Sequence, residues 1–124
     1  HQMDSEYFQV PLETADIINR AKAHKKSVGV VGTSSVRTLE TVVVSGFQIT
    51  ARKGWTDKFI YPPYEFKMSD MLITNFHLPR SSLLVLVSAF AGLERIRAAY
   101  RHSIDAGYRF FSYGDAMWLE RSRP

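Results

Sequence analysis

The stretch SVGVVGTSSVRTLETVVVSG, residues 27–46, decides the fold class of this 124-residue chain. Its first part, residues 27–32, is a short apolar run without a polar face, which predicts a strand buried on both sides of a sheet. The hydroxyl residues 33–35 form a turn, and the apolar residues after them recur at helical spacing up to Gly46. A buried strand that leads through a tight turn into a helix is typical of an α/β layer architecture.

The patterns on both sides of this stretch extend the alternation. Aromatic and β-branched residues predict a strand at residues 6–10, and Thr14 is expected to cap a helix that runs through Lys25. The inner side of that helix is expected to hold Ile17, Ile18 and Ala21. Residues 49–66 are rich in Gly, Pro and aromatics and predict a strand flanked by a long ordered loop, because adjacent prolines disrupt a central strand.

The rest of the chain continues with strands and helices of ordinary length. The expected elements are a strand at 71–76, a buried helix at 83–91 capped by Ser81 or Ser82, an amphipathic helix at 94–106 with Ile96, Tyr100 and Ile104 facing inward, and a strand at 108–112. Together these elements predict an α/β fold, a layered sheet with flanking helices, in a single domain over residues 1–124.

The composition indicates a folded globular protein, with 45% hydrophobic, 13% aromatic and 23% charged residues. The absence of cysteine excludes a disulfide scaffold, thiolate catalysis and cysteine-ligated metal sites. The longest apolar run, residues 83–91, is about half the ~20 residues that a membrane helix requires, and no signal peptide is visible. We therefore expect a cytoplasmic protein without a membrane partner. Its net charge of +4 is compatible with a polyanionic partner without establishing one.

The first residue is His1, without an initiator Met, and an acidic and aromatic stretch follows at once. This start resembles the middle of a longer chain. We therefore expect the sequence to be a fragment.

A candidate anion site follows the strand at 27–32. A helix that begins there aims backbone N–H groups at one point, and its dipole adds about half a positive charge. Thr33, Ser34 and Ser35 can add hydroxyl donors. Arg37 can add a guanidinium fork for phosphate or carboxylate. The alternative is a serine cap on a surface helix, since the spacing matches neither GxGxxG nor a P-loop.

A second candidate site is ITNFHLPRS, residues 73–81. His77 stands where a strand ends, which is where α/β sheets often place ligand-binding residues, and an imidazole is a natural base near neutral pH. Asn75 offers an amide to a base or ribose, and Arg80 lies near a helix N-terminus. The alternative is that His77 only bonds backbone in a tight turn. With four His and no HExxH spacing, no metal site is expected.

Two further segments combine aromatics with a carboxylate. In YRFFSYGDAM, residues 108–117, Gly114 permits a tight turn and Asp115 presents a carboxylate after a strand. The aromatics of this segment can stack on a heterocycle, or they pack in the core. In Gly54–Asp57, GWTD, a loop carries Trp55 beside Asp57, which favours binding over packing.

Four segments, taken in order, carry a resemblance to a known family. They are GTSSVRTLE at 32–40, GWTDKFIYPPYEF at 54–66, LITNFHLPRSSLLVLVSAFAG at 72–92 and YRFFSYGDAM at 108–117. They resemble the C-terminal part of the S-adenosylmethionine:tRNA ribosyltransferase-isomerases of queuosine biosynthesis, from His1 to about Leu119. Proteins of this family are longer and carry an N-terminal part and a β-barrel-like domain. The resemblance thus implies the C-terminal part of a larger α/β domain in a two-domain enzyme.

The reaction implied by the resemblance is a transfer to tRNA. The ribosyl unit of S-adenosylmethionine moves to the aminomethyl group of 7-aminomethyl-7-deazaguanine at the tRNA wobble position. The sugar is isomerised to an epoxycyclopentanediol, adenine and methionine leave, and epoxyqueuosine tRNA results. S-adenosylmethionine is a co-substrate, and no prosthetic group is implied. The implied partners are this tRNA, S-adenosylmethionine and the missing N-terminal part of the same protein.

Roles for individual residues can be matched to this chemistry. Removal of a proton beside the sulfonium needs a positioned base, for which His77 is the first candidate and Asp115 the second. Asn75 and Asp57 are candidates for assisting adenine departure. The methionine carboxylate or a tRNA phosphate is expected on Thr33, Ser34, Ser35 and Arg37. The remaining expected substrate-binding residues are Phe76, Arg80 and Tyr113. The alternative function is a catalytically inactive tRNA- or nucleotide-binding module, since the chain is expected to be truncated.

Overall fold

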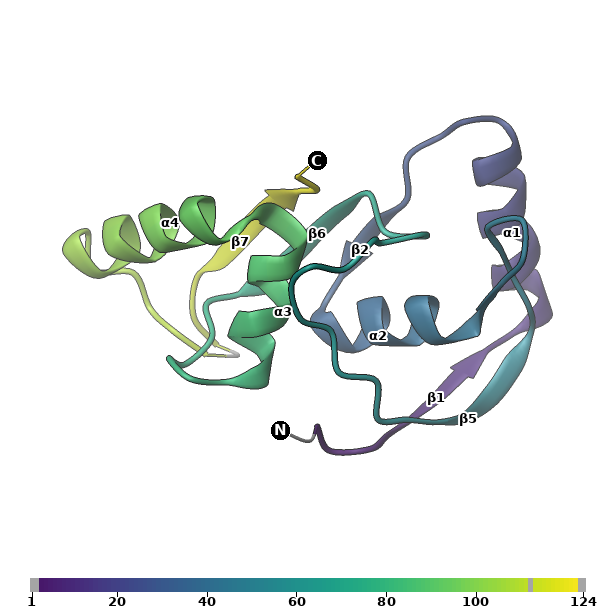
Figure 1. Ribbon diagram of the computed structural model, residues 1–124, viewed down its shortest axis with the longest axis horizontal. Coiled ribbons are helices and arrows are strands. Elements are labelled where there is room, and N and C mark those ends of the chain that lie inside the picture. The colour runs from purple at the N-terminus through teal and green to yellow at the C-terminus, as the bar shows by residue number, and fades with distance from the viewer. Residues whose placement is uncertain (1–2, 112, 123–124) are drawn as a thin grey trace.

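A computed structural model describes residues 3–111 and 113–122 of the chain. Helices and strands alternate along it (Figure 1). In chain order the elements are β1 (Glu6–Val10), α1 (Leu12–Ala23), β2 (Gly29–Val31), α2 (Thr33–Val42), β3 (Val43–Val44), β4 (Gln48–Ile49), β5 (Arg52–Thr56), β6 (Met71–Asn75), α3 (Ser82–Ala91), α4 (Leu93–Asp105) and β7 (Ala116–Glu120).

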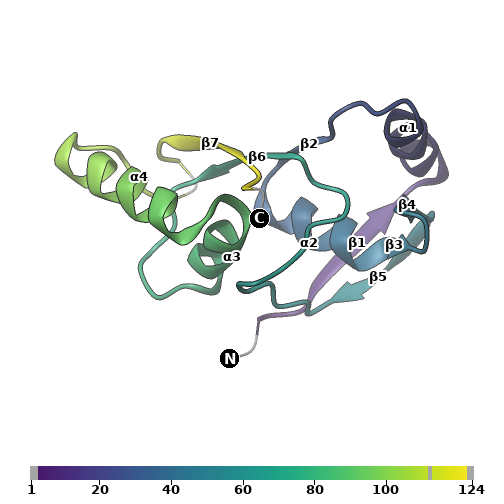
Figure 2. The same cartoon turned by 45° about the horizontal axis from the view of Figure 1, so that its top comes forward.

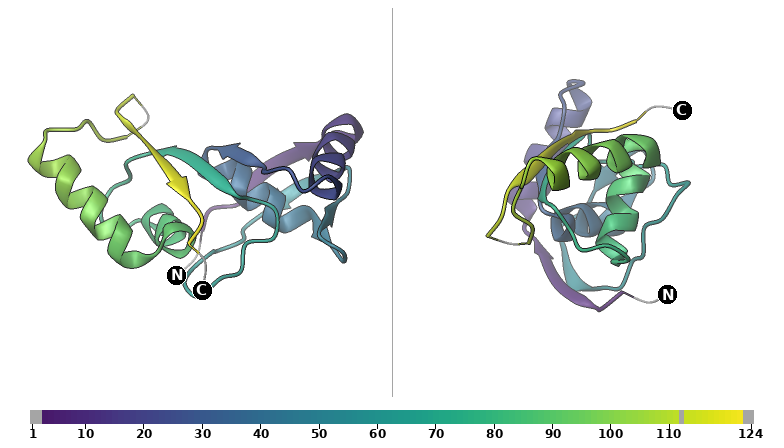
Figure 3. Two further views of the ribbon diagram at one scale, coloured as in Figure 1. Left: turned by 90° about the horizontal axis from the view of Figure 1, so that it is seen from above. Right: turned by 90° about the vertical axis from the view of Figure 1, so that its left-hand side faces the viewer.

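The central sheet has the strand order β2-β6-β7. Strand β2 runs parallel to β6, and β7 runs antiparallel to it. On one face of this sheet Val30, Leu72 and Leu119 are buried, and helices α2 and α3 contact the strands (Figure 3). A parallel pair needs a crossover, and here the crossover from β2 to β6 contains α2. The predicted α/β fold class, a sheet with flanking helices, is confirmed.

Two small antiparallel sheets complete the fold. Strand β1 pairs with β5, and β3 pairs with β4. Helix α1 is tied to β4 because the Asn19 amide donates to the carbonyl of Ile49 at 2.9 Å and accepts from its N–H at 2.8 Å. In Figure 2, α1 lies at one end of the molecule and α4 at the other, with β2, β6 and α2 between them.

The core is formed by side chains from both halves of the chain. Its fully buried members include Val36 and Val42 of α2, Leu72 of β6, and Leu86 and Phe90 of α3. No helix among the described residues is both long and apolar enough to cross a membrane.

Several predicted elements are confirmed. The strand expected at 6–10 is β1, and the buried helix expected at 83–91 is α3. Ser81 caps α3, because its hydroxyl accepts a hydrogen bond from the N–H of Leu84 at 3.1 Å. This is the interaction that favours serine at an N-cap.

The inward-facing residues predicted for α1 and α4 are partly wrong. Helix α1 begins at Leu12 after Pro11, so Thr14 is inside the helix and does not cap it. Ala15 is its buried residue, and Ile17 is 62% exposed because it lies two positions, about 200°, around the helix from Ala15. In α4, Ile104 is 66% exposed, and the preceding residue, Ser103, is buried instead.

Residues 27–46 also depart from their predicted structure at two points. Within the described residues β2 is buried on one side only, and Val31 is 71% exposed. Helix α2 ends at Val42, because the β-branched residues after it form β3 and pair with β4. Gly46, with a φ of +80°, lies in the turn between β3 and β4 and does not end the helix.

The expectations for the third and fourth candidate segments need correction as well. Residues 108–111 form no strand, and Ser112 lies outside the described residues. The backbone there turns so closely that a Cβ on Gly114 would lie 2.5 Å from the carbonyl oxygen of Arg109, so only glycine fits. Trp55 belongs to β5 and not to a loop.

Candidate functional site

A pocket of about 360 Å³ opens where β2 and β6 end. The parallel strands bring the turn after β2 beside the segment after β6, as expected for an α/β sheet. Its lining comes from four segments of the chain: Gly32, Thr33, Ser34, Thr74, Asn75, Phe76, His77, Leu78, Ser81, Leu83 and Phe111. The volume lies at the low end of the range for small-molecule sites.

One wall of the pocket is the beginning of α2. Gly32 is the N-cap with a φ of +92°, and no side chain caps the helix. The first N–H groups of a helix lack partners within it and carry the positive end of its dipole. Thr33 and Ser34 stand at this end and line the pocket. The wall therefore offers backbone donors and hydroxyl groups to a ligand.

His77 lines the same pocket. Its Nε2 lies 3.1 Å from the hydroxyl oxygen of Thr74, and its backbone N–H donates to the hydroxyl of Tyr100 at 2.8 Å. Burial lowers the pKa of His77 below its ordinary value, because a charged imidazolium loses solvation there. Burial raises the pKa of Tyr100, so its hydroxyl stays protonated. One hydrogen bond thus holds the ring of His77 and another holds its backbone, and the lowered pKa favours the neutral imidazole.

Two other predicted residues, Asn75 and Phe76, line the pocket but also contact neighbouring segments of the protein. Phe76 is 3% exposed and packs edge-to-face with Tyr100 and Tyr108. The amide of Asn75 donates to the carbonyls of Gly114 at 3.4 Å and Asp115 at 3.2 Å. These contacts fix the segment after β6 against the loop before β7. The pocket therefore brings together five predicted residues: Thr33, Ser34, Asn75, Phe76 and His77.

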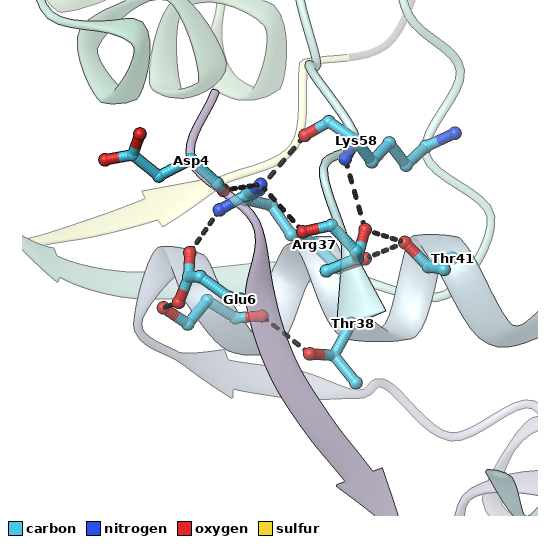
Figure 4. A network of polar contacts seen from close by, with 8 residues as sticks. Asp4, Glu6, Arg37, Thr38, Thr41 and Lys58 are labelled. Carbon is cyan, nitrogen blue, oxygen red and sulfur yellow. Dashed lines mark hydrogen bonds and ion pairs between the residues drawn. The ribbon is translucent and has the colours of Figure 1, made fainter. Parts of the chain in front are cut away.

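Arg37 does not reach the pocket. Its side chain is 1% exposed and pairs with the Glu6 carboxylate. The guanidinium also donates to the carbonyls of Asp4 at 3.0 Å, Lys58 at 3.0 Å and Thr56 at 3.4 Å (Figure 4). The prediction that Arg37 offers a fork to an anion disagrees with this arrangement, because its donors are used inside the protein.

The remaining predicted residues lie outside the pocket lining. Ser35, Asp57 and Arg80 are exposed, and Tyr113 is 100% exposed. Asp115, the second candidate base, is exposed, and its carboxylate accepts the N–H of Arg109 at 2.8 Å. Its own N–H donates to the carbonyl of Arg109 at 2.9 Å. Asp115 thus holds a turn, which is a common use of aspartate in loops.

Glu6 contacts the pocket wall and was not among the residues predicted from the sequence. Its second carboxylate oxygen accepts a hydrogen bond of 2.6 Å from the hydroxyl of Ser34, on the pocket wall. The only signal in the sequence is a charged residue at the start of a predicted strand, and nothing local links it to Ser34. Thr74 and Tyr100, which hold His77, were also missed as contacts of that residue.

Comparisons with known proteins show which family the chain resembles in sequence and fold. The profile of a family described as "Queuosine biosynthesis protein" matches residues 1–119. The S-adenosylmethionine:tRNA ribosyltransferase-isomerase of Natranaerobius thermophilus is 56% identical over 120 residues, which are 97% of this chain and 35% of that protein. The protein of the same name from Nitratidesulfovibrio vulgaris is 58% identical over 119 residues, 96% of this chain and 32% of that protein.

A solved structure is similar over most of the fold. The crystal structure of S-adenosylmethionine tRNA ribosyltransferase from Thermotoga maritima matches with a TM-score of 0.84 and 49% identity, over 90% of this chain and 39% of that one. The chain spans about a third of the length of the curated relatives it matches. It belongs to the queuosine biosynthesis protein family.

Proposed function

We propose that this chain supplies part of the S-adenosylmethionine pocket of a tRNA ribosyltransferase-isomerase. The relatives carry this activity in their names, and that is where the choice of donor and acceptor comes from. The observation that carries the proposal is the pocket lined by both the beginning of α2 and His77. Backbone donors, hydroxyls and a neutral imidazole around one small cavity suit a polar donor molecule that must lose a proton.

The α2 wall is the proposed place of the methionine carboxylate. Thr33 and Ser34 present backbone N–H groups at an uncapped helix end, which is a favourable environment for an anion. Because the Ser34 hydroxyl donates its proton to Glu6, its oxygen can still accept a hydrogen bond from an ammonium or hydroxyl group of the ligand. Arg37 has no part in this proposal.

His77 is the proposed base. When its Nε2 carries the ring proton and donates to Thr74, the lone pair of Nδ1 is free to accept a proton. The imidazole removes a proton from the carbon beside the sulfonium, and the electron pair of that C–H bond stays on the carbon next to the positive sulfur. A lowered pKa keeps the ring in its proton-accepting form at neutral pH.

The full proposed reaction uses tRNA as acceptor. The ribosyl unit passes to the aminomethyl group of 7-aminomethyl-7-deazaguanine at the wobble position and is isomerised there, with loss of adenine and methionine. The net charge of +4 is compatible with a polyanionic acceptor. Ser35, which does not line the pocket, remains a predicted contact to tRNA. Asp57, Arg80 and Tyr113 remain predicted contacts to tRNA or donor.

Isothermal titration of S-adenosylmethionine into the 124-residue chain tests the donor pocket. We expect binding by the wild type and weaker binding by His77→Ala. His24→Ala is the matched control, because His24 is exposed at the C-terminal end of α1 and does not line the pocket. Thermal melts verify that each variant is folded. A folded chain that does not bind the donor would remove the pocket assignment and leave only the family membership.

A second measurement separates an enzyme from a binding module. The chain is mixed with S-adenosylmethionine and tRNA that carries the aminomethyl base, and free adenine and methionine are quantified. Release of both supports the transferase. Salt-dependent binding of tRNA without adenine release supports the alternative of a binding module for this chain.

A further inference from the structure

Three large apolar side chains form a row on the outer face of the central sheet, opposite α2 and α3. Val31 of β2, Ile73 of β6 and Trp118 of β7 lie directly across from one another in the strand register. Their exposed fractions are 71%, 36% and 65%. We call these three residues the outer apolar row. In the left view of Figure 3, β6 and β7 can be followed side by side.

This face has the composition of a buried one. An antiparallel sheet with one wet face alternates apolar and polar residues, whereas all-parallel sheets are covered on both faces. This sheet is mixed, with β2 parallel and β7 antiparallel to β6. Here the inward row, Val30, Leu72 and Leu119, is at most 8% exposed, and the outward row is equally apolar. Strand β2 also pairs with β6 alone, so its other edge has no strand partner among the described residues. Contiguous exposed apolar surface of this kind marks a contact site.

The length of the relatives indicates what covers the row. The chain corresponds to only 35% of the Natranaerobius thermophilus protein and 39% of the Thermotoga maritima chain. We propose that the outer apolar row is the docking face for the part of the family's polypeptide that lies outside these 124 residues. The occupant is an apolar segment of protein that completes the second layer of the sheet.

The charge beside the row favours protein over nucleic acid. The next outward pair in the register is Met71 opposite Glu120, so a carboxylate lies on the same face as Trp118. None of the three side chains of the row is cationic. The Glu120 carboxylate would repel a phosphate backbone, and the row offers it no cationic partner. An apolar protein segment, in contrast, is stabilised by removing the row from water.

Cysteine labelling tests the proposal, because the chain contains no cysteine of its own. Val31→Cys places one thiol in the row, and Ser45→Cys places a control thiol at an exposed position in the turn between β3 and β4. Alkylation rates are measured by mass spectrometry of the labelled peptide in two proteins. One is this chain, and the other is this chain joined to the unmatched part of the Natranaerobius thermophilus relative.

We expect both thiols to react readily in the 124-residue chain. In the longer polypeptide, the alkylation rate of Val31→Cys should fall about tenfold or more, because a docked segment must dissociate before the thiol reacts. The alkylation rate of Ser45→Cys should change little. If the joined protein does not fold, the same two cysteines are placed at the aligned positions of the relative itself. Equal rates in the folded longer protein overturn the proposal. If alkylation of Val31→Cys in the 124-residue chain slows as the protein concentration rises, the row binds a second copy of the chain instead. If alkylation slows only when tRNA is added, the row binds nucleic acid instead.

Discussion

The hydroxyl of Ser34 donates a 2.6 Å hydrogen bond to the carboxylate of Glu6, although 28 positions separate the two residues. The other oxygen of that carboxylate pairs with the guanidinium of Arg37, which is 1% exposed (Figure 4). A buried cation thus fixes a carboxylate, and the carboxylate fixes a hydroxyl on the pocket wall. The beginning of α2 is positioned from β1 by this chain of contacts.

Ser34→Ala should weaken binding of S-adenosylmethionine about three- to tenfold, because one hydrogen bond contributes about 0.5–1.5 kcal/mol. Glu6→Gln should also weaken binding, since the amide can donate to the Ser34 oxygen and reverse the direction of that bond. Ser35→Ala is the matched control, because Ser35 is exposed on the same helix turn and does not line the pocket. Isothermal titration measures all three. Equal affinities for the Ser34 and Ser35 variants would show that the α2 wall does not contact the donor.

Arg37→Met should lower the free energy of unfolding by at least about 2 kcal/mol, because it leaves three backbone carbonyls and the partly exposed Glu6 carboxylate without their donor. Arg97→Ala is the comparison, since Arg97 is 60% exposed and pairs with Glu94 on the surface of α4. That variant should cost less than about 1 kcal/mol. Urea denaturation of both variants measures the difference. Similar losses in the two would mean that the Arg37 network contributes no more than a surface ion pair.

The pocket could be predicted in part because its residues stand at ends of elements. Thr33 and Ser34 follow an apolar run, and His77 follows another, so a parallel pair of strands suffices to bring them together. Arg37 is different, because its burial depends on Glu6, which lies 31 positions away on β1. Spacing along one helix carries no information about such a partner. Of the four residues predicted on this helix, Thr33 and Ser34 therefore line the pocket, and Ser35 and Arg37 do not.

Side-chain burial was harder to predict than the elements themselves. Asp115 looks like a free carboxylate in sequence, and only the close turn at Gly114 shows that it bonds the backbone of Arg109. Val31 lies in a run with the pattern of a doubly buried strand, yet its side chain is 71% exposed, because an apolar pattern does not record which segments pack against each face. Local propensity determined the strand, and tertiary contacts determined its environment.

Glu40→Ala should destabilise the fold by at least about 2 kcal/mol, because two backbone N–H groups lose a charged acceptor. The Glu40 carboxylate is 3% exposed and accepts from the N–H groups of Lys67 and Met68, each at 2.9 Å, and from the hydroxyl of Tyr64 at 3.2 Å. Glu65→Ala, at an exposed position in the same loop, is the control. Thermal melts should separate the two variants clearly. If they melt alike, Glu40 does not hold the loop after the prolines.

The stability of the fold at alkaline pH should depend on Tyr64, whose hydroxyl donates to the Glu40 carboxylate. Burial, the nearby Glu40 charge and their hydrogen bond all raise the pKa of Tyr64, so the folded state favours the neutral phenol. A raised pKa gives a stabilisation that is present below about pH 10 and is lost as the pH rises above it. Tyr64→Phe cannot ionise, so its stability should fall less steeply than that of the wild type above pH 10. Parallel pH curves for the two proteins would contradict this assignment.

His77 should produce the opposite dependence at acid pH. Its pKa is lowered in the folded state, so as the pH falls below about 6.5 the unfolded chain takes up the proton first. The stabilisation from keeping His77 neutral is therefore complete above about pH 6.5 and declines below it, until the folded pKa is reached. Because His77→Gln retains the three other histidines, the difference between its pH–stability curve and that of the wild type isolates this one group. NMR titration of the imidazole gives an independent value, and a midpoint at or above 6.5 would mean that His77 is not held neutral in the pocket.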